Sequence, residues 1–152
     1  MDAPQTITVT SGAFAEGERI PATYTCDDAD ISPPLAWEGA PADAQALALV
    51  VDDPDAPSGT FTHWVVLDLA PEVSRSDEDA VPVGGVQAQN SARRASYFGP
   101  CPPSGTHRYR FTVYALAAPT GLAEGASLSE ALAAIEERAV AWGRLTGVYS
   151  RS

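Results

Sequence analysis

The chain contains no lysine, and its nine basic residues are all arginine. Twenty acidic residues outnumber them and leave a formal net charge of -11. A protein that binds nucleic acid or an anionic membrane needs a basic surface that releases counterions. The charge balance therefore argues against a nucleic-acid partner. It is typical of halophilic adaptation, although a GC-rich genome that favours arginine codons produces the same pattern.

Cysteine is scarce, and long hydrophobic runs are missing. Cys26 and Cys101 are too few to define a disulfide framework, so a bond between them stays open. No stretch approaches the roughly 18 apolar residues of a membrane span, and residues 1–9 lack the basic and apolar regions of a secretory signal. The default expectation is a soluble cytoplasmic protein with reduced thiols and no membrane span.

The residues that are present describe a folded, turn-rich chain. With 152 residues, 45% of them hydrophobic, 12 glycines and 13 prolines, we expect one β-dominated domain over residues 1–152. Apolar runs on both faces predict central strands. The predicted strands are 6–14, 46–51, 63–69 and 109–116, with a short closing strand at 145–149, and residues 83–104 form a long loop.

One helix is predicted near the C-terminus. Ser127 and Glu130 have the spacing of a capping box, and Gly143 is placed to end the helix. Apolar residues recur after the cap at the spacing of one buried stripe: Leu128, Leu132, Ile135, Ala139 and Trp142. The pattern predicts a helix that reaches Trp142.

Polar, titratable residues stand at the ends of the predicted central strands. Asp53 follows one strand, and His63 begins the next. If these strands are antiparallel neighbours, the two residues meet in space, and strand alternation turns His107 and Tyr109 the same way. The sequence therefore predicts a cluster of Asp53, His63, His107 and Tyr109.

This cluster suits a small anionic ligand, because imidazolium and phenol groups donate hydrogen bonds to phosphate or carboxylate oxygens. Binding is expected to improve when both histidines are protonated. Two enzyme alternatives stay open. Asp53, His63 and His107 are a candidate metal set, and Cys101 with His107 is a candidate pair for a hydrolase.

The turn after Asp53 is rich in proline. Pro54 and Pro57 each fix one backbone φ angle and remove one N–H donor, which favours a stiff turn that presents Asp53. A cis peptide bond between Ala56 and Pro57 is a hypothesis for this turn.

Two motifs resemble the phosphatidylethanolamine-binding protein family, also called the Raf kinase inhibitor protein family, in its bacterial and archaeal branch. They are DPDAP at 53–57 and GPCPPSGTHRY at 99–109, and the likeness covers nearly the whole chain. The resemblance implies a Greek-key β-fold in which a large central antiparallel sheet packs on a smaller one, with few peripheral helices.

The resemblance also implies a surface pocket for phosphate-bearing head groups, with no catalytic residue, metal or cofactor. Carried over by motif, its ligand-binding residues are Asp53, His63, His107 and Tyr109, with Gly99, Pro102 and Pro103 at the rim. Thr62 stands where relatives often have Trp or His, so we expect a less aromatic wall. A protein partner, such as a protease or kinase, is a further alternative, and the oligomeric state stays open, a homodimer included.

Overall fold

The computed structural model describes residues 3–151 and is mainly β, as predicted. In chain order the elements are β1 (Thr8–Thr10), the short 3-10 helix η1 (Ala22–Tyr24), β2 (Leu35–Glu38), β3 (Ala46–Asp53), β4 (Phe61–Leu69), β5 (Arg75–Ser76), β6 (Val86–Ala88), β7 (Gly105–Leu116), α1 (Leu128–Arg138) and β8 (Ala139–Arg151). The expected Greek-key fold class is confirmed by a large antiparallel sheet, a small sheet and one α-helix.

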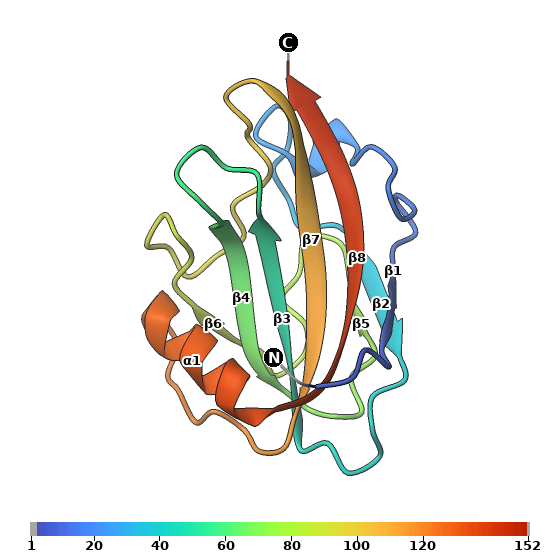
Figure 1. Ribbon diagram of the computed structural model, residues 1–152, viewed down its shortest axis with the longest axis vertical. Helices are drawn as coiled ribbons and strands as arrows, with labels where there is room; N and C mark the ends of the chain where they lie inside the picture. The colour runs from blue at the N-terminus through green and yellow to red at the C-terminus, as the bar shows by residue number, and fades with distance from the viewer. Residues whose placement is uncertain (1–2, 152) are drawn as a thin grey trace.

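The large sheet has the strand order β6-β4-β3-β7-β8, and the small sheet has the order β1-β2-β5. Every paired strand is antiparallel to its neighbour. The small sheet lies beside the β8 side of the large one, and α1 lies toward β4 and β6 (Figure 1). Antiparallel pairing brings the end of β3 next to the starts of β4 and β7, which is where the predicted site residues stand.

The central strand β3 of the large sheet is buried on both faces and carries apolar side chains on each. Leu47, Leu49 and Val51 join the core that faces the small sheet. The intervening residues of β3 pack with Ala131 and Ile135 of α1. This explains why the sequence of β3 shows no polar face.

The predicted helix is correct at its start and wrong at its end. Ser127 accepts a hydrogen bond from the backbone N–H of Glu130, as the capping box requires. The helix ends at Arg138, and Trp142 and Gly143 lie in β8. A Cβ on Gly143 would meet the carbonyl oxygen of Ile7, so this glycine allows the residue before β1 to approach β8 closely instead of ending a helix.

Three other expectations need correction in length or kind. The first strand covers only Thr8–Thr10 of the predicted 6–14, and the predicted loop at 83–104 contains β6. The closing strand runs for 13 residues, because β8 pairs with β7 along its whole length.

Over the described part of the chain, no helix has the length and apolar character needed to cross a membrane.

Candidate functional site

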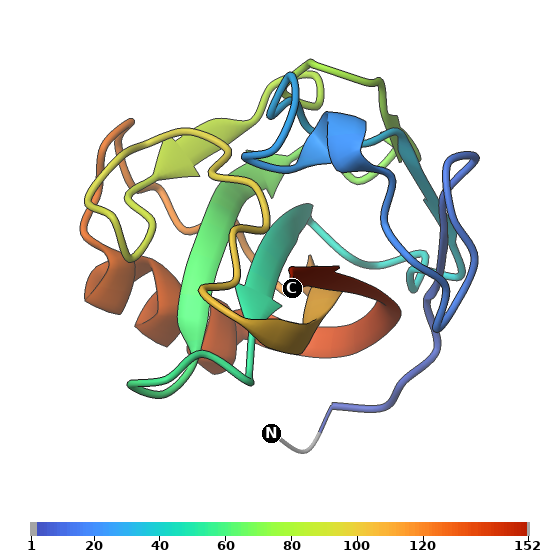
Figure 2. The same ribbon diagram turned by 90° about the horizontal axis from the view of Figure 1, so that it is seen from above.

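The four predicted cluster residues meet in one pocket at the end of the large sheet. We call it the histidine pocket; its cavity is about 270 Å³, and its lining residues are Asp53, Ala56, Pro57, Phe61, His63, Phe98, Cys101, Pro102, Pro103, His107 and Tyr109. Figure 2 looks onto this end, where the segments that follow β3 and lead into β4 and β7 gather near the end of β8. The volume suits a small ligand or one head group of a larger one.

A β-bulge in β4 directs His63 into the pocket. Val51 pairs with Trp64 and Asp52 pairs with Thr62, so His63 is the extra residue on β4. Without the bulge, strict alternation would place His63 and Trp64 on opposite faces. The bulge allows Trp64 to join the core below the pocket while His63 lines the pocket itself.

Asp53 and His107 form a buried pair on one side of the pocket. Nδ1 of His107 lies 2.6 Å from Oδ2 of Asp53, and the two residues are 7% and 3% exposed. A carboxylate oxygen accepts, so Nδ1 carries the proton and donates it. Nε2 of His107 makes no hydrogen bond within residues 3–151, which leaves it available to a ligand.

His63 is held through the same ring atom but by a neutral partner. Its Nδ1 lies 2.6 Å from the carbonyl oxygen of Phe98, which can only accept a hydrogen bond. Burial lowers the pKa of His63, although the Phe98 carbonyl and the charge of Asp53 act in the opposite direction. The environment therefore favours neutral His63, and the expected improvement of binding on protonation of both histidines stays a prediction.

The hydroxyl of Tyr109 has an unusual environment for a buried polar group. Tyr109 is fully buried and lines the pocket, and its hydroxyl has no hydrogen-bond partner in the part of the chain that the structure describes. Burial raises the pKa of Tyr109, and the charge of Asp53 adds to this effect. An unpaired buried hydroxyl costs free energy unless a ligand or water occupies the adjoining space.

The rest of the pocket wall is apolar and aromatic. Ring centroids of Phe61 and Phe98 lie 4.8 Å and 5.8 Å from that of His63. Thr62 is buried beside Ser91 and is absent from the pocket lining within residues 3–151, and the neighbouring Phe61 contributes an aromatic ring to the wall. Phe61 could have been found from sequence, because it stands two residues before His63 on the same strand.

A disulfide and three hydrogen bonds attach the pocket rim to the segment that follows η1. Cys26 and Cys101 are bonded, and Cys101 lines the pocket. The tyrosine hydroxyl of Tyr97 donates to the Tyr24 carbonyl, the N–H of Gly99 to Asp30, and the N–H of Cys26 to the Pro100 carbonyl. The expectation of reduced thiols is therefore wrong.

Only some of the predicted rim residues line the pocket. Pro102 and Pro103 line the pocket, whereas Gly99 is absent from its lining over residues 3–151. A Cβ on Gly99 would lie 2.1 Å from Oδ1 of Asp30. Gly99 therefore allows the rim to pack closely against the neighbouring segment.

The turn after Asp53 is ordered by side-chain contacts. Oδ1 of Asp53 accepts a hydrogen bond of 2.7 Å from the N–H of Asp55, which fixes the carboxylate that also binds His107. Residues 3–151 contain no cis peptide bond, so the cis hypothesis for Ala56 and Pro57 is wrong.

Two arginines of β7 form ion pairs with aspartates of β3 and of the turn that follows it. Arg108 donates from its backbone and side chain to Asp55, which holds the pKa of that carboxyl well below its usual range. Arg110 binds Asp52 through two nitrogens. Both guanidinium groups are therefore engaged by carboxylates of the protein.

The enzyme alternatives receive little support. Cys101 is bonded to Cys26, so it offers no thiolate to act as a nucleophile with His107. Among the described residues, no three or more His, Cys, Asp or Glu side chains are grouped closely enough to hold a metal ion.

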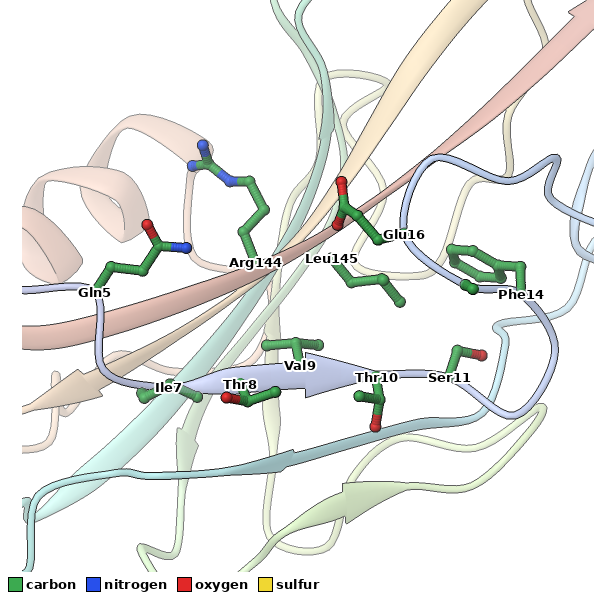
Figure 3. A pocket seen from close by; sticks show the side chains of 11 residues that line it. Gln5, Ile7, Thr8, Val9, Thr10, Ser11, Phe14, Glu16, Arg144 and Leu145 are labelled. Carbon is green, nitrogen blue, oxygen red and sulfur yellow. The ribbon is translucent and has the colours of Figure 1, made fainter.

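A larger cavity of about 440 Å³ lies between β1 and β8 (Figure 3). Its two charged side chains already have structural partners. Glu16 accepts from the N–H of Thr146, and Arg144 donates to Thr112 and stacks on Trp142. Because these charges are engaged, the histidine pocket is the better candidate site.

The chain is similar to several known proteins. The model of the family described as phosphatidylethanolamine-binding protein matches residues 10–150. A UPF0098 protein of Methanothermobacter thermautotrophicus is 45% identical over 144 residues, which are 91% of this chain and 95% of the relative. The candidate lipoprotein LppC of Mycobacterium tuberculosis is 44% identical over 149 residues, which are 97% of this chain and 74% of the relative.

Two solved structures have the same fold. A candidate phosphatidylethanolamine-binding protein homologue, CT736 of Chlamydia trachomatis, superposes with a TM-score of 0.90 at 37% identity. YbcL of E. coli, described as a new member of the mammalian family, also has a TM-score of 0.90, at 28% identity. Each comparison covers 97% of this chain and 99% of the other.

Proposed function

Since the chain belongs to the phosphatidylethanolamine-binding protein family, we propose that it binds small anionic ligands, phosphate or phosphate-bearing head groups, in the histidine pocket. The role is non-enzymatic, of a regulatory or inhibitor-like kind. Its ligand-binding residues are Asp53, His63, His107 and Tyr109, with Pro102 and Pro103 at the rim.

The observation that carries the proposal is the buried hydroxyl of Tyr109. It has no partner among residues 3–151, and Tyr109 is one of the residues that line the same small pocket as two imidazoles, each anchored through Nδ1. A tetrahedral anion has several oxygens and can accept from Tyr109 while it contacts His107. The apolar wall strengthens these hydrogen bonds, because it lowers the local dielectric constant.

The pocket chemistry supports binding more than catalysis. Asp53 is already bonded to His107 and to the N–H of Asp55, and Cys101 is in a disulfide. The carboxylate thus orients an imidazole, and the sulfur is no nucleophile. A protein partner that presents a phosphorylated side chain would use the same groups, so partner docking stays a prediction.

Calorimetric titration with methyl phosphate at pH 6 tests the proposal. We expect Tyr109→Phe to weaken binding about tenfold while leaving thermal stability nearly unchanged, because its hydroxyl has no protein partner to lose. Tyr149→Phe is the matched control. Its hydroxyl donates to Asp27 outside the pocket, so this variant should lose stability and keep its affinity. Equal affinity of wild type and Tyr109→Phe would contradict the proposed site.

A further inference from the structure

The proton positions in the histidine pocket define which phosphate chemistry it accepts. His63 donates through Nδ1 to the Phe98 carbonyl, so its neutral ring has a lone pair on Nε2. Nε2 makes no hydrogen bond over residues 3–151 and is not closed off by protein atoms, and His63 lines the pocket. A ligand that fills the pocket therefore meets a hydrogen-bond acceptor at this point.

A second proton on His63 is opposed by its surroundings. His63 is 4% exposed, and burial is the largest effect on its pKa, which it lowers. The titratable groups that line the pocket with it are Asp53 from β3 and His107 and Tyr109 from β7, and the charges of Asp53, Asp52 and Asp30 raise its pKa against the effect of burial. The rim contributes no titratable group, because Cys101 is in the disulfide. Burial thus favours the neutral form of His63.

The charges around the pocket disfavour a doubly charged ligand. Neither lysine nor arginine lines it within residues 3–151, and the chain as a whole has a net charge of -11. Arg108 is engaged by Asp55, and any positive charge on His107 is already compensated by Asp53. A doubly charged anion would bring an unpaired negative charge into an apolar wall, which is costly.

We propose that the histidine pocket selects phosphate groups that still carry a proton, the monoanions of phosphomonoesters and of inorganic phosphate, over phosphodiesters and sulfate. The P–OH group donates to Nε2 of His63, and the remaining oxygens accept from the hydroxyl of Tyr109 and contact His107. A phosphodiester or sulfate has no proton to donate and leaves the His63 lone pair unmatched. This inference rests on the proposed function and specifies its ligand class.

Calorimetric titration of the wild-type protein with methyl phosphate, dimethyl phosphate and sulfate at pH 6 distinguishes selectivity for a protonated phosphate group from unselective anion binding. We expect methyl phosphate to bind at least about tenfold more tightly than the other two, the effect of one hydrogen bond to a charged group. Equal affinity for all three, or tighter binding of dimethyl phosphate, overturns the inference and leaves the proposed function standing. If none of the three binds, the proposed function itself fails.

The pH dependence gives an independent readout. A phosphomonoester loses its second proton near pH 6, whereas dimethyl phosphate and sulfate do not titrate between pH 5.5 and 8. Any change with pH in the affinity for dimethyl phosphate or sulfate therefore arises from titration of protein groups alone. The preference for methyl phosphate over dimethyl phosphate should shrink as the pH rises through this range, and a preference that stays constant contradicts the inference.

Two variants identify the residue responsible. His63→Gln offers an amide that can rotate to donate or to accept, so the preference for methyl phosphate should disappear. His107→Gln is the matched control: affinity for every anion should fall while the preference remains. The wild-type panel decides the question even if a variant folds poorly.

The source of the phosphate group is tested with lipids. Short-chain phosphatidic acid is a phosphomonoester, and phosphatidylethanolamine with the same chains is a phosphodiester. We expect the same order of affinity as for the methyl esters if the group comes from a lipid. Tighter binding of phosphatidylethanolamine overturns the selectivity.

Discussion

Cys26 and Cys101 lie 75 residues apart in the sequence, form a disulfide, and place a half-cystine in the wall of the histidine pocket. The bond joins the segment after η1 to the rim that also holds His63 through the Phe98 carbonyl. The rim is therefore attached both to the segment after η1 and to His63 in the pocket.

Reduction of this disulfide should destabilise the protein by about 2–4 kcal/mol, because the unfolded chain gains the freedom that the cross-link removes. Urea denaturation with and without dithiothreitol measures the effect. The double variant Cys26→Ser with Cys101→Ser is the control and should not respond to dithiothreitol. A wild-type transition that does not move on reduction would sink this prediction.

Gly99→Ala should destabilise the rim, because its Cβ would lie 2.1 Å from Oδ1 of Asp30 and 2.6 Å from the Tyr24 carbonyl oxygen. Overpacking of this kind costs about 1–3 kcal/mol. We also expect weaker binding of methyl phosphate, since the rim must shift. Gly12→Ala is the control, because its Cβ meets nothing within 4 Å. Thermal unfolding compares the two variants, and equal melting temperatures would refute the close-packing role.

Acid should destabilise the protein through His63. Its pKa is lowered in the folded state, while in the unfolded chain it is about 6.5. Between these values the unfolded state binds an extra proton, so stability falls as the pH drops below about 6.5 and levels off below the folded pKa. Chemical denaturation from pH 7 to pH 5 measures the slope.

His63→Asn is the informative variant for this pH effect, because an amide can still donate to the Phe98 carbonyl but does not titrate. Its stability should vary less with pH than that of the wild type. His107→Asn keeps His63 and should retain the wild-type dependence due to that residue. Parallel profiles for wild type and His63→Asn would count against the assignment.

The strands of the large sheet could be predicted because their sequence pattern records their burial. β3 is apolar on both faces and lies between β4 and β7, as its composition indicates. The helix end could not be read in the same way. Trp142 fits the helical spacing, but β8 gains a complete ladder with β7, and this tertiary pairing outweighs a local pattern.

The residues that line the pocket could be predicted from the sequence better than the contacts they make. Asp53 and His63 converge because a short connection joins two antiparallel strands, and His107 and Tyr109 share a face by alternation. Phe98 was missed, since its carbonyl reaches His63 across 35 residues of sequence. Cys101 was identified, but its oxidation state depends on where Cys26 lies.

The sequence by itself determined the central strands and the four residues that meet at their ends, because both follow from alternation and from the direction of adjacent strands. The tertiary structure decided which nitrogen of His63 holds the proton, which face the bulge turns it to, and which segment the rim is bonded to. Those features arise from contacts between segments far apart in the chain, and local patterns do not encode such contacts.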